Sequence, residues 1–201
     1  MVKRLTELVI TPQFLLIVSI ILIVGGHLIF NKTYLDCREI IKKHLECFKT
    51  SKGKYSLFSL FLYFFVPYFV AIALVQIRII DNDVVNILTI IISILTSMLF
   101  TLLTLILDMR NKVLNNIKYN ANKAAISGKL LKETYYTIMF EILLSVIILI
   151  MCFIEIFSKN YSFFSSIVIY YLTFVMLLNL FIVLKRIFKV IDEDIKVQDN
   201  E

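Results

Sequence analysis

Glycine and proline are scarce in this chain, whose 201 residues include four Gly and two Pro. Loops that cradle phosphates depend on closely spaced glycines, so a nucleotide-binding loop of that kind is excluded. Transporters built on interrupted spans need helix-breaking residues at matching places in two helices, and that class is disfavoured for the same reason. Pro67 predicts one kink, in a hydrophobic segment.

Cysteine and histidine are too few and too scattered to predict a metal site or a catalytic centre. Cys37, Cys47 and Cys152 follow neither a disulfide pattern nor a zinc-ligand spacing. His27 and His44 lie in different predicted helices, without a nucleophile or a metal ligand nearby in sequence. The polar stretches of the chain are too short to fold into a soluble domain with a substrate pocket. We therefore expect no enzyme, no cofactor and no metal.

Hydrophobic residues, by contrast, make up 60% of the chain, and the mean hydropathy is +0.88. A bilayer core about 30 Å thick needs roughly 20 apolar residues per helix. Five segments meet this need, and they are 13–30, 56–77, 84–107, 136–157 and 163–184. The first segment is the shortest, and four spans remain if it does not cross. The predicted fold is an all-α polytopic integral membrane protein with a single transmembrane domain over residues 1–201.

Short connections join the second span to the third and the fourth to the fifth, which predicts two helical hairpins. Most Lys and Arg residues lie in the loops 31–55 and 108–135 and in the tail 185–201. By the positive-inside rule, both loops and the C-terminus face the cytoplasm. The second loop is predicted to extend the third span, to turn near Gly128 and to lead into the fourth span.

The first basic loop contains TYLDCREIIKKHLECFKT, in which Tyr34, Cys37, Ile41, Leu45 and Phe48 recur every three or four residues. This spacing predicts an amphipathic helix. Such a helix would lie on the anionic leaflet or on a neighbouring helix, or it would dock on a partner protein. The candidate contacts for lipid or for a partner are Arg38, Lys42, Lys43, Arg110, Lys112 and Lys118.

Two spans carry their polar side chains on one helical face. On the third span these lie within an arc of about 140° at 100° per residue, and they are Asn86, Thr89, Ser93, Thr96, Ser97, Thr101, Thr104 and Asp108. On the fourth span they lie within about 80°, and they are Thr134, Thr137, Glu141, Ser145, Cys152, Glu155 and Lys159, with Ile148 between them. Small hydroxylated residues also suit helix packing, because Ser and Thr can bond the preceding turn of their own helix.

Glu141 and Glu155 favour a second interpretation, in which the stripes line an aqueous path. A carboxylate inside a span costs on the order of 2.5–3.5 kcal/mol unless it finds water, a partner or a proton. In a homo-oligomer the two glutamates would form acidic rings, and Ile148 between them would form a hydrophobic gate. One chain has too few helices to surround a pore, so this hypothesis requires several copies.

This plan of four or five spans, short outer turns, basic cytosolic loops and no enzymatic domain resembles small membrane subunits of bacterial antiphage defence systems of the Kiwa and Hailong types. The abundance of Ile, Lys and Asn suits an AT-rich bacterial genome. The resemblance covers the architecture of the whole chain. It implies a protein of the bacterial inner (cytoplasmic) membrane that disrupts the membrane, or holds a partner there, when infection is detected.

Three functions follow as hypotheses. The first is an oligomeric effector that forms a gated ion-conducting or membrane-disrupting assembly and depolarises the cell. The second is a non-conducting scaffold or sensor that recruits a cytosolic protein through its basic loops, with a nucleic acid or nucleotide ligand left open. The third is a holin-like lysis protein.

Overall fold

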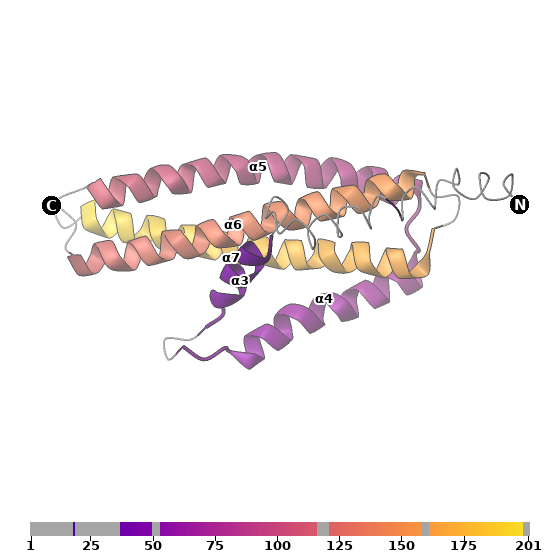
Figure 1. Ribbon diagram of the computed structural model, residues 1–201, viewed down its shortest axis with the longest axis horizontal. Helices are drawn as coiled ribbons and strands as arrows, with labels where there is room; N and C mark the ends of the chain where they lie inside the picture. The colour runs from indigo at the N-terminus through magenta and orange to yellow at the C-terminus, as the bar shows by residue number, and fades with distance from the viewer. Residues whose placement is uncertain (1–17, 19–36, 50–52, 116–120, 158–160, 199–201) are drawn as a thin grey trace, which may run out of the picture. The chain divides into compact units, whose positions relative to one another are not determined.

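The computed structural model describes residues 18, 37–49, 53–115, 121–157 and 161–198 (Figure 1). Its labelled helices are α3 (Arg38–Glu46), α4 (Leu57–Ile77), α5 (Asn82–Asn115), α6 (Ala121–Ile156) and α7 (Phe163–Gln198). Within the described residues, extended pairing is limited to one isolated bridge between Lys49 and Tyr55. The predicted all-α class is confirmed for these parts of the chain. Contacts divide the chain into two units, Met1–Glu39 and Ile40–Glu201, and the packing of α4 to α7 belongs to the second.

Four helices are long and apolar enough to cross a membrane. The segments concerned are Leu60–Ile77, Asn82–Val113, Ser127–Ile156 and Phe163–Asp192. They overlap the second to fifth predicted spans, which supports a membrane protein. The first predicted segment, 13–30, lies outside the described residues except for Val18.

Three of the helices, α5, α6 and α7, continue well beyond the predicted spans. α5 has 34 residues, or about 51 Å at 1.5 Å per residue, against a bilayer core of about 30 Å. The predicted extension of the third span is therefore present. The turn expected near Gly128 is wrong, because Gly128 lies inside the 36-residue helix α6. One glycine costs a helix only about 1 kcal/mol, and the packing of α6 against two neighbours offsets that cost.

The core of the unit is a seam between α5, α6 and α7, which run side by side in Figure 1. Its buried residues recur every seven positions, the spacing of helices that wind around each other with a left-handed twist. On α5 these residues are Val85, Ile92, Leu99, Ile106 and Val113, and on α7 they are Ile169, Met176, Val183 and Val190. The same spacing on α6 joins Thr134, Glu141, Ile148 and Glu155.

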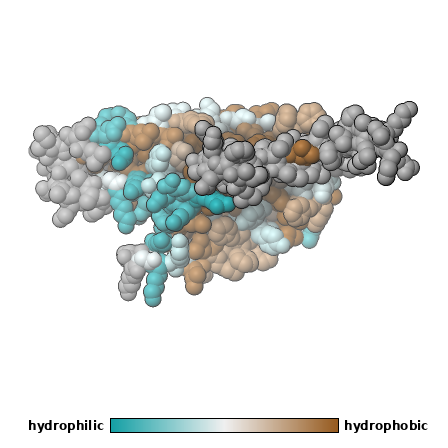
Figure 2. Space-filling model, viewed as in Figure 1, coloured by the Kyte–Doolittle hydropathy of each residue, from teal (hydrophilic) through white to brown (hydrophobic). Residues whose placement is uncertain are grey.

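α4 packs on α7 rather than on α5, although a connection of only four residues joins α4 to α5. Of the two predicted hairpins, α6 and α7 thus pack on each other as expected, and α4 and α5 do not form extensive contacts. Tyr63, Ala71 and Val75 form a narrow buried strip on α4. Pro67 is buried in line with them, and most of the other described α4 side chains are exposed and apolar, with a surface that is brown in Figure 2. A helix that is apolar on all sides suits a lipid environment.

Candidate functional site

The polar stripe of α6 lies inside the chain. Ser127, Thr134, Thr137, Glu141, Ser145 and Glu155 are all buried. The hydroxyls bond to their own helix: Thr134 donates to the carbonyl of Leu130 at 2.8 Å and Ser145 to that of Ile142 at 2.8 Å. These bonds satisfy the hydroxyls without a partner helix. The two glutamate carboxyl groups cannot bond the carbonyls of their own helix in this way, so they need partners from other helices.

Glu141 meets polar side chains from two other helices, Tyr63 of α4 and Asn179 of α7. Asn179 is near enough to interact with both the Tyr63 hydroxyl and the Glu141 carboxyl. Hydrogen-bonding geometry is not reached, however, since the Glu141 oxygens and both Asn179 amide atoms lack a partner among the described residues. All three side chains are at most 4% exposed. A carboxyl group in this setting is compatible with its neutral, protonated form.

His44 closes this cluster from α3. Its ring stacks on Phe140 at a centroid distance of 4.0 Å with planes 4° apart, and it meets Phe48 edge-on at 5.4 Å. Its Nε2 lies 3.4 Å from the Tyr63 hydroxyl. Burial, and then the charge of Arg186, lower the pKa of His44 from 6.5 to about 4. The ring is therefore neutral at pH 7, and it packs between Tyr63 of α4 and Phe140 of α6.

Arg186 of α7 ties the neighbouring turns of α6 together. Its Nη1 donates to the Glu133 carbonyl at 2.8 Å and to the Thr137 hydroxyl at 2.7 Å, and its Nη2 lies 3.9 Å from the Glu133 carboxylate. The Sγ of Cys47, the residue that follows α3, lies 3.9 Å from the same Glu133 carbonyl oxygen. Burial raises the pKa of the Cys47 thiol. Side chains from the end of α3 and from α7 thus both contact the Glu133 carbonyl of α6.

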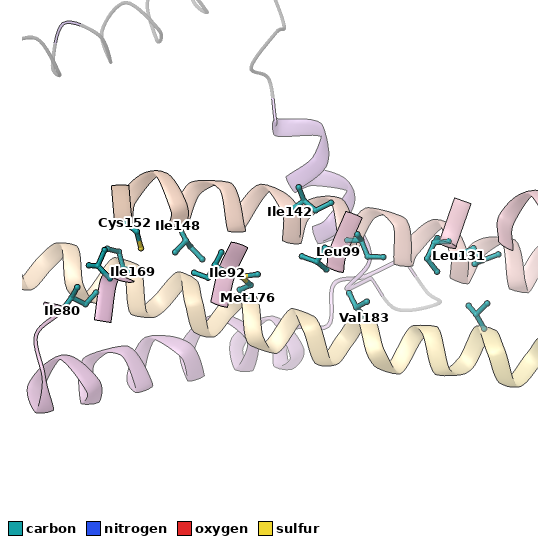
Figure 3. Close-up of a cluster of buried hydrophobic side chains, with 14 of the residues drawn as sticks. Ile80, Ile92, Leu99, Leu131, Ile142, Ile148, Cys152, Ile169, Met176 and Val183 are labelled. Carbon is teal, nitrogen blue, oxygen red and sulfur yellow. The ribbon is translucent and has the colours of Figure 1, made fainter. Parts of the chain in front are cut away.

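The candidate gate, Ile148, is fully buried in the seam rather than on the outside of the chain. Figure 3 shows it converging with Ile92 of α5 and with Ile169 and Met176 of α7. Glu155, at the far end of α6, accepts a hydrogen bond from the Ser165 hydroxyl, and its second oxygen has no partner among the described residues. In this conformation Ile148 and the two glutamates face the interior of one chain.

The polar stripe of α5, unlike that of α6, lies mostly on the outside of the chain. Most of its members are exposed, namely Asn86, Ser93, Ser97, Thr101, Thr104 and Asp108, while Thr89 and Thr96 are half-buried. The hydroxyls bond carbonyls of their own helix, as Ser93 does to Thr89 at 2.7 Å and Thr101 to Ser97 at 3.2 Å. The structure therefore does not bring the α5 hydroxyls to Glu141. The exposed members form an outward face, which we call the hydroxyl face and which consists of Asn86, Ser93, Ser97, Thr101, Thr104 and Asp108.

The basic loop candidates are spread over several helices. Arg38, Lys42, Arg110 and Lys112 are exposed, and Lys118 lies outside the described residues. Lys43 is half-buried and pairs with Glu46 at 3.3 Å. Lys112 pairs with Asp108 at 2.9 Å.

The sequence interpretation missed His44, Tyr63, Asn179 and Arg186 as members of the buried cluster and its surroundings. A signal for two of them was present, because Asn179 and Arg186 are seven residues apart on α7, the same spacing as the buried apolar positions of that helix. Tyr63 gave no signal, since α4 is apolar all round. His44 also had a signal, because it lies three residues after Ile41 and four before Phe48, next to the predicted apolar face of α3, but histidine was counted as polar.

No family model, curated protein or solved structure matches the chain. The candidate site accordingly stands on the geometry of its own residues.

Proposed function

We propose that this protein is an oligomeric membrane effector whose copies associate through the hydroxyl face of α5 and conduct ions when assembled. The architecture resembles that of membrane subunits of antiphage defence systems, and on that resemblance we propose depolarisation of an infected bacterium as its role. The observation that carries the proposal is the outward exposure of a polar face along a whole membrane-crossing helix.

The hydroxyl face is long enough to cross the bilayer. Asn86 and Asp108 are 22 residues apart along α5, or about 33 Å, which matches a hydrocarbon core of about 30 Å. Within the chain, α5 makes its extensive contacts with α6, which leaves the hydroxyl face open to a neighbour. Small hydroxylated residues favour close helix approach in lipid, and in a ring of copies they would equally line water.

Placing the path along α5 changes which residues would line it. Glu141, Ile148 and Glu155 are buried between helices of one chain, so they support the fold of each copy in this conformation. The path between copies would be lined by the α5 hydroxyls, with Asn86 at one mouth and Asp108 at the other. Asp108 pairs with Lys112 at 2.9 Å, so both charges would be present at that mouth.

Disulfide crosslinking tests the association. Ser97→Cys places a thiol on the hydroxyl face, and Met98→Cys, one residue on and also exposed, places it about 100° away around the helix. In a background without the three native cysteines, oxidation in native-like bilayers should link copies of the Ser97→Cys variant more readily. Equal linking of both variants, or monomers throughout, would overturn the proposed interface.

Ion flux from liposomes tests conduction. The double change Ser97→Ala and Thr101→Val removes two lining hydroxyls and should lower flux several-fold, whereas Ile91→Val, an exposed α5 position off the hydroxyl face, should leave it unchanged. Crosslinked copies without flux above protein-free liposomes would refute conduction and favour the non-conducting scaffold.

A further inference from the structure

A pocket between α3 and α6 carries chemistry that neither the buried cluster nor the hydroxyl face uses. It has a volume of about 240 Å³ and is lined by Lys43, Glu46 and Cys47 from the α3 region, and by Lys129, Lys132, Glu133 and Tyr136 of α6. We infer that this pocket binds a phosphate-bearing anion. A water molecule takes about 30 Å³ of liquid, so the pocket has room for a phosphate group together with several waters.

The two carboxylates of the pocket are already engaged. Glu133 lies 3.9 Å from the Arg186 guanidinium. Glu46 lies 3.3 Å from Lys43 and 4.0 Å from Lys49, and its hydrogen bond with Lys43 lowers its pKa, so that it stays ionised at neutral pH. Their negative charge is thus balanced within the protein.

Lys129 and Lys132 add positive charge that these carboxylates do not balance. Both lysines are exposed, and within the described part of the chain neither forms an ion pair with an acidic side chain. Lys129, Lys132 and Tyr136 project from one face of α6, because residues three and four apart are neighbours on a helix. The Lys132 ammonium lies 6.0 Å from the centre of the Tyr136 ring, and the tyrosine hydroxyl adds a neutral donor. Ammonium and hydroxyl donors converging on one pocket fit phosphate oxygens.

The position along α6 indicates where such an anion would come from. Lys129 and Lys132 lie in the first two turns of the membrane-crossing segment Ser127–Ile156, which puts the pocket at the level of lipid headgroups. Figure 2 shows hydrophilic residues gathered around α3 beside the brown surface of α4. A lipid headgroup and a soluble phosphate would offer the pocket the same chemistry. This site is separate from the α5 interface and does not rest on it.

Binding can be measured on the purified full-length protein by native mass spectrometry with added phosphatidylglycerol or phosphatidylcholine. The wild type should retain phosphatidylglycerol preferentially. The double variant Lys129→Gln and Lys132→Gln should retain it about tenfold less, because each lysine near an anionic headgroup contributes to the attraction. Lys129→Arg with Lys132→Arg keeps the charge and should restore retention.

The matched control is Lys185→Gln with Lys189→Gln, which removes two exposed α7 lysines outside the pocket. It should bind phosphatidylglycerol like the wild type. In a second arm, inorganic phosphate is added and the melting temperature is recorded. A rise that the Lys129→Gln and Lys132→Gln variant loses, without any lipid preference, would assign the site to a soluble phosphate. Equal lipid retention by both glutamine variants, together with equal melting shifts, would overturn the inference.

Discussion

The burial of His44 makes the docking of α3 depend on pH in a way that can be calculated. When residues 40–48 are docked, the ring binds a proton with a pKa of about 4. When they are released into solvent, the pKa returns to its ordinary value of about 6.5. Lowering the pH therefore favours the released state. Docking is fully stable above pH 6.5 and loses stability as the pH falls from 6.5 towards 4.

The size of the effect follows from the two pKa values. At about 1.36 kcal/mol per pH unit, the full loss below pH 4 is about 3 kcal/mol. At pH 5 the loss is about 2 kcal/mol, which lowers the docking equilibrium about 30-fold. The groups that face His44 from the other helices are Tyr63, Phe140 and the Arg186 guanidinium, with Glu141 behind Tyr63. Glu46, on α3 itself, has a pKa below 4.5, so pH 5 mostly isolates the histidine.

Hydrogen exchange measures this directly. The protection of amides 40–48, corrected for intrinsic exchange rates, should fall about 30-fold between pH 7.5 and pH 5. The His44→Phe variant keeps an aromatic ring against Phe140 and Phe48 but cannot bind a proton, so its protection should stay nearly constant. A wild-type protein with constant protection, or a phenylalanine variant with the same fall, would refute the assignment to His44.

Substitutions at three positions test the interior of the helix bundle. Ile148→Ala should lower the free energy of unfolding in detergent by about 1–3 kcal/mol. The loss is smaller than in water because the unfolded chain stays in an apolar medium, so that only the cavity destabilises the fold. Ile150→Ala, at a position 55% exposed, should change the free energy of unfolding little. Glu141→Gln mimics a neutral carboxyl and should leave the unfolding free energy within about 0.5 kcal/mol, whereas Glu141→Lys should cost about 2.5–3.5 kcal/mol or block insertion. Arg186→Lys cannot reproduce the bridge to Glu133 and should cost about 1.5–3 kcal/mol; an unchanged melting temperature would show that the bridge contributes nothing.

The hydrophobic pattern predicted four helices that are apolar and long enough to cross a membrane, but the polar stripes did not predict which face of α5 is buried. In water, burial follows from polarity, but in lipid both apolar and hydroxylated faces are tolerated at a helix surface. The polar faces of α5 and α6 accordingly differ in burial. Most of the α5 face is exposed, and the α6 stripe with Glu141 is buried. The seven-residue spacing of Val85, Ile92 and Leu99 was the better guide to the buried face of α5.

The spacing predicted the helix α3 correctly but did not identify its buried residue. Ile41, on the predicted apolar face, is 41% exposed, and His44 is fully buried. Aromatic rings explain the difference, because Phe140, Tyr63 and Phe48 form a surface that a neutral imidazole fits by stacking. A hydropathy pattern treats histidine as polar and takes no account of such a surface. Phe48 is four residues along the chain, but Tyr63 and Phe140 come from α4 and α6, so spacing within α3 could not have identified those two rings.

The same rings make α3 a support for α4. α4 meets the bundle mainly through α7, and its strip of Tyr63, Ala71 and Val75 is narrow. Phe48 lies 5.0 Å from the Tyr63 ring and His44 lies 6.0 Å from it, so α3 fills the space beside the first turns of α4. Release of α3 would leave Tyr63 without those neighbours, while Ala71 and Val75 would keep α7. Lowering the pH should therefore reduce the hydrogen-exchange protection of the α4 amides around Tyr63 together with that of α3. The α4 amides around Ala71 should stay protected. An equal loss of protection along α4 would show that α3 does not support one half more than the other.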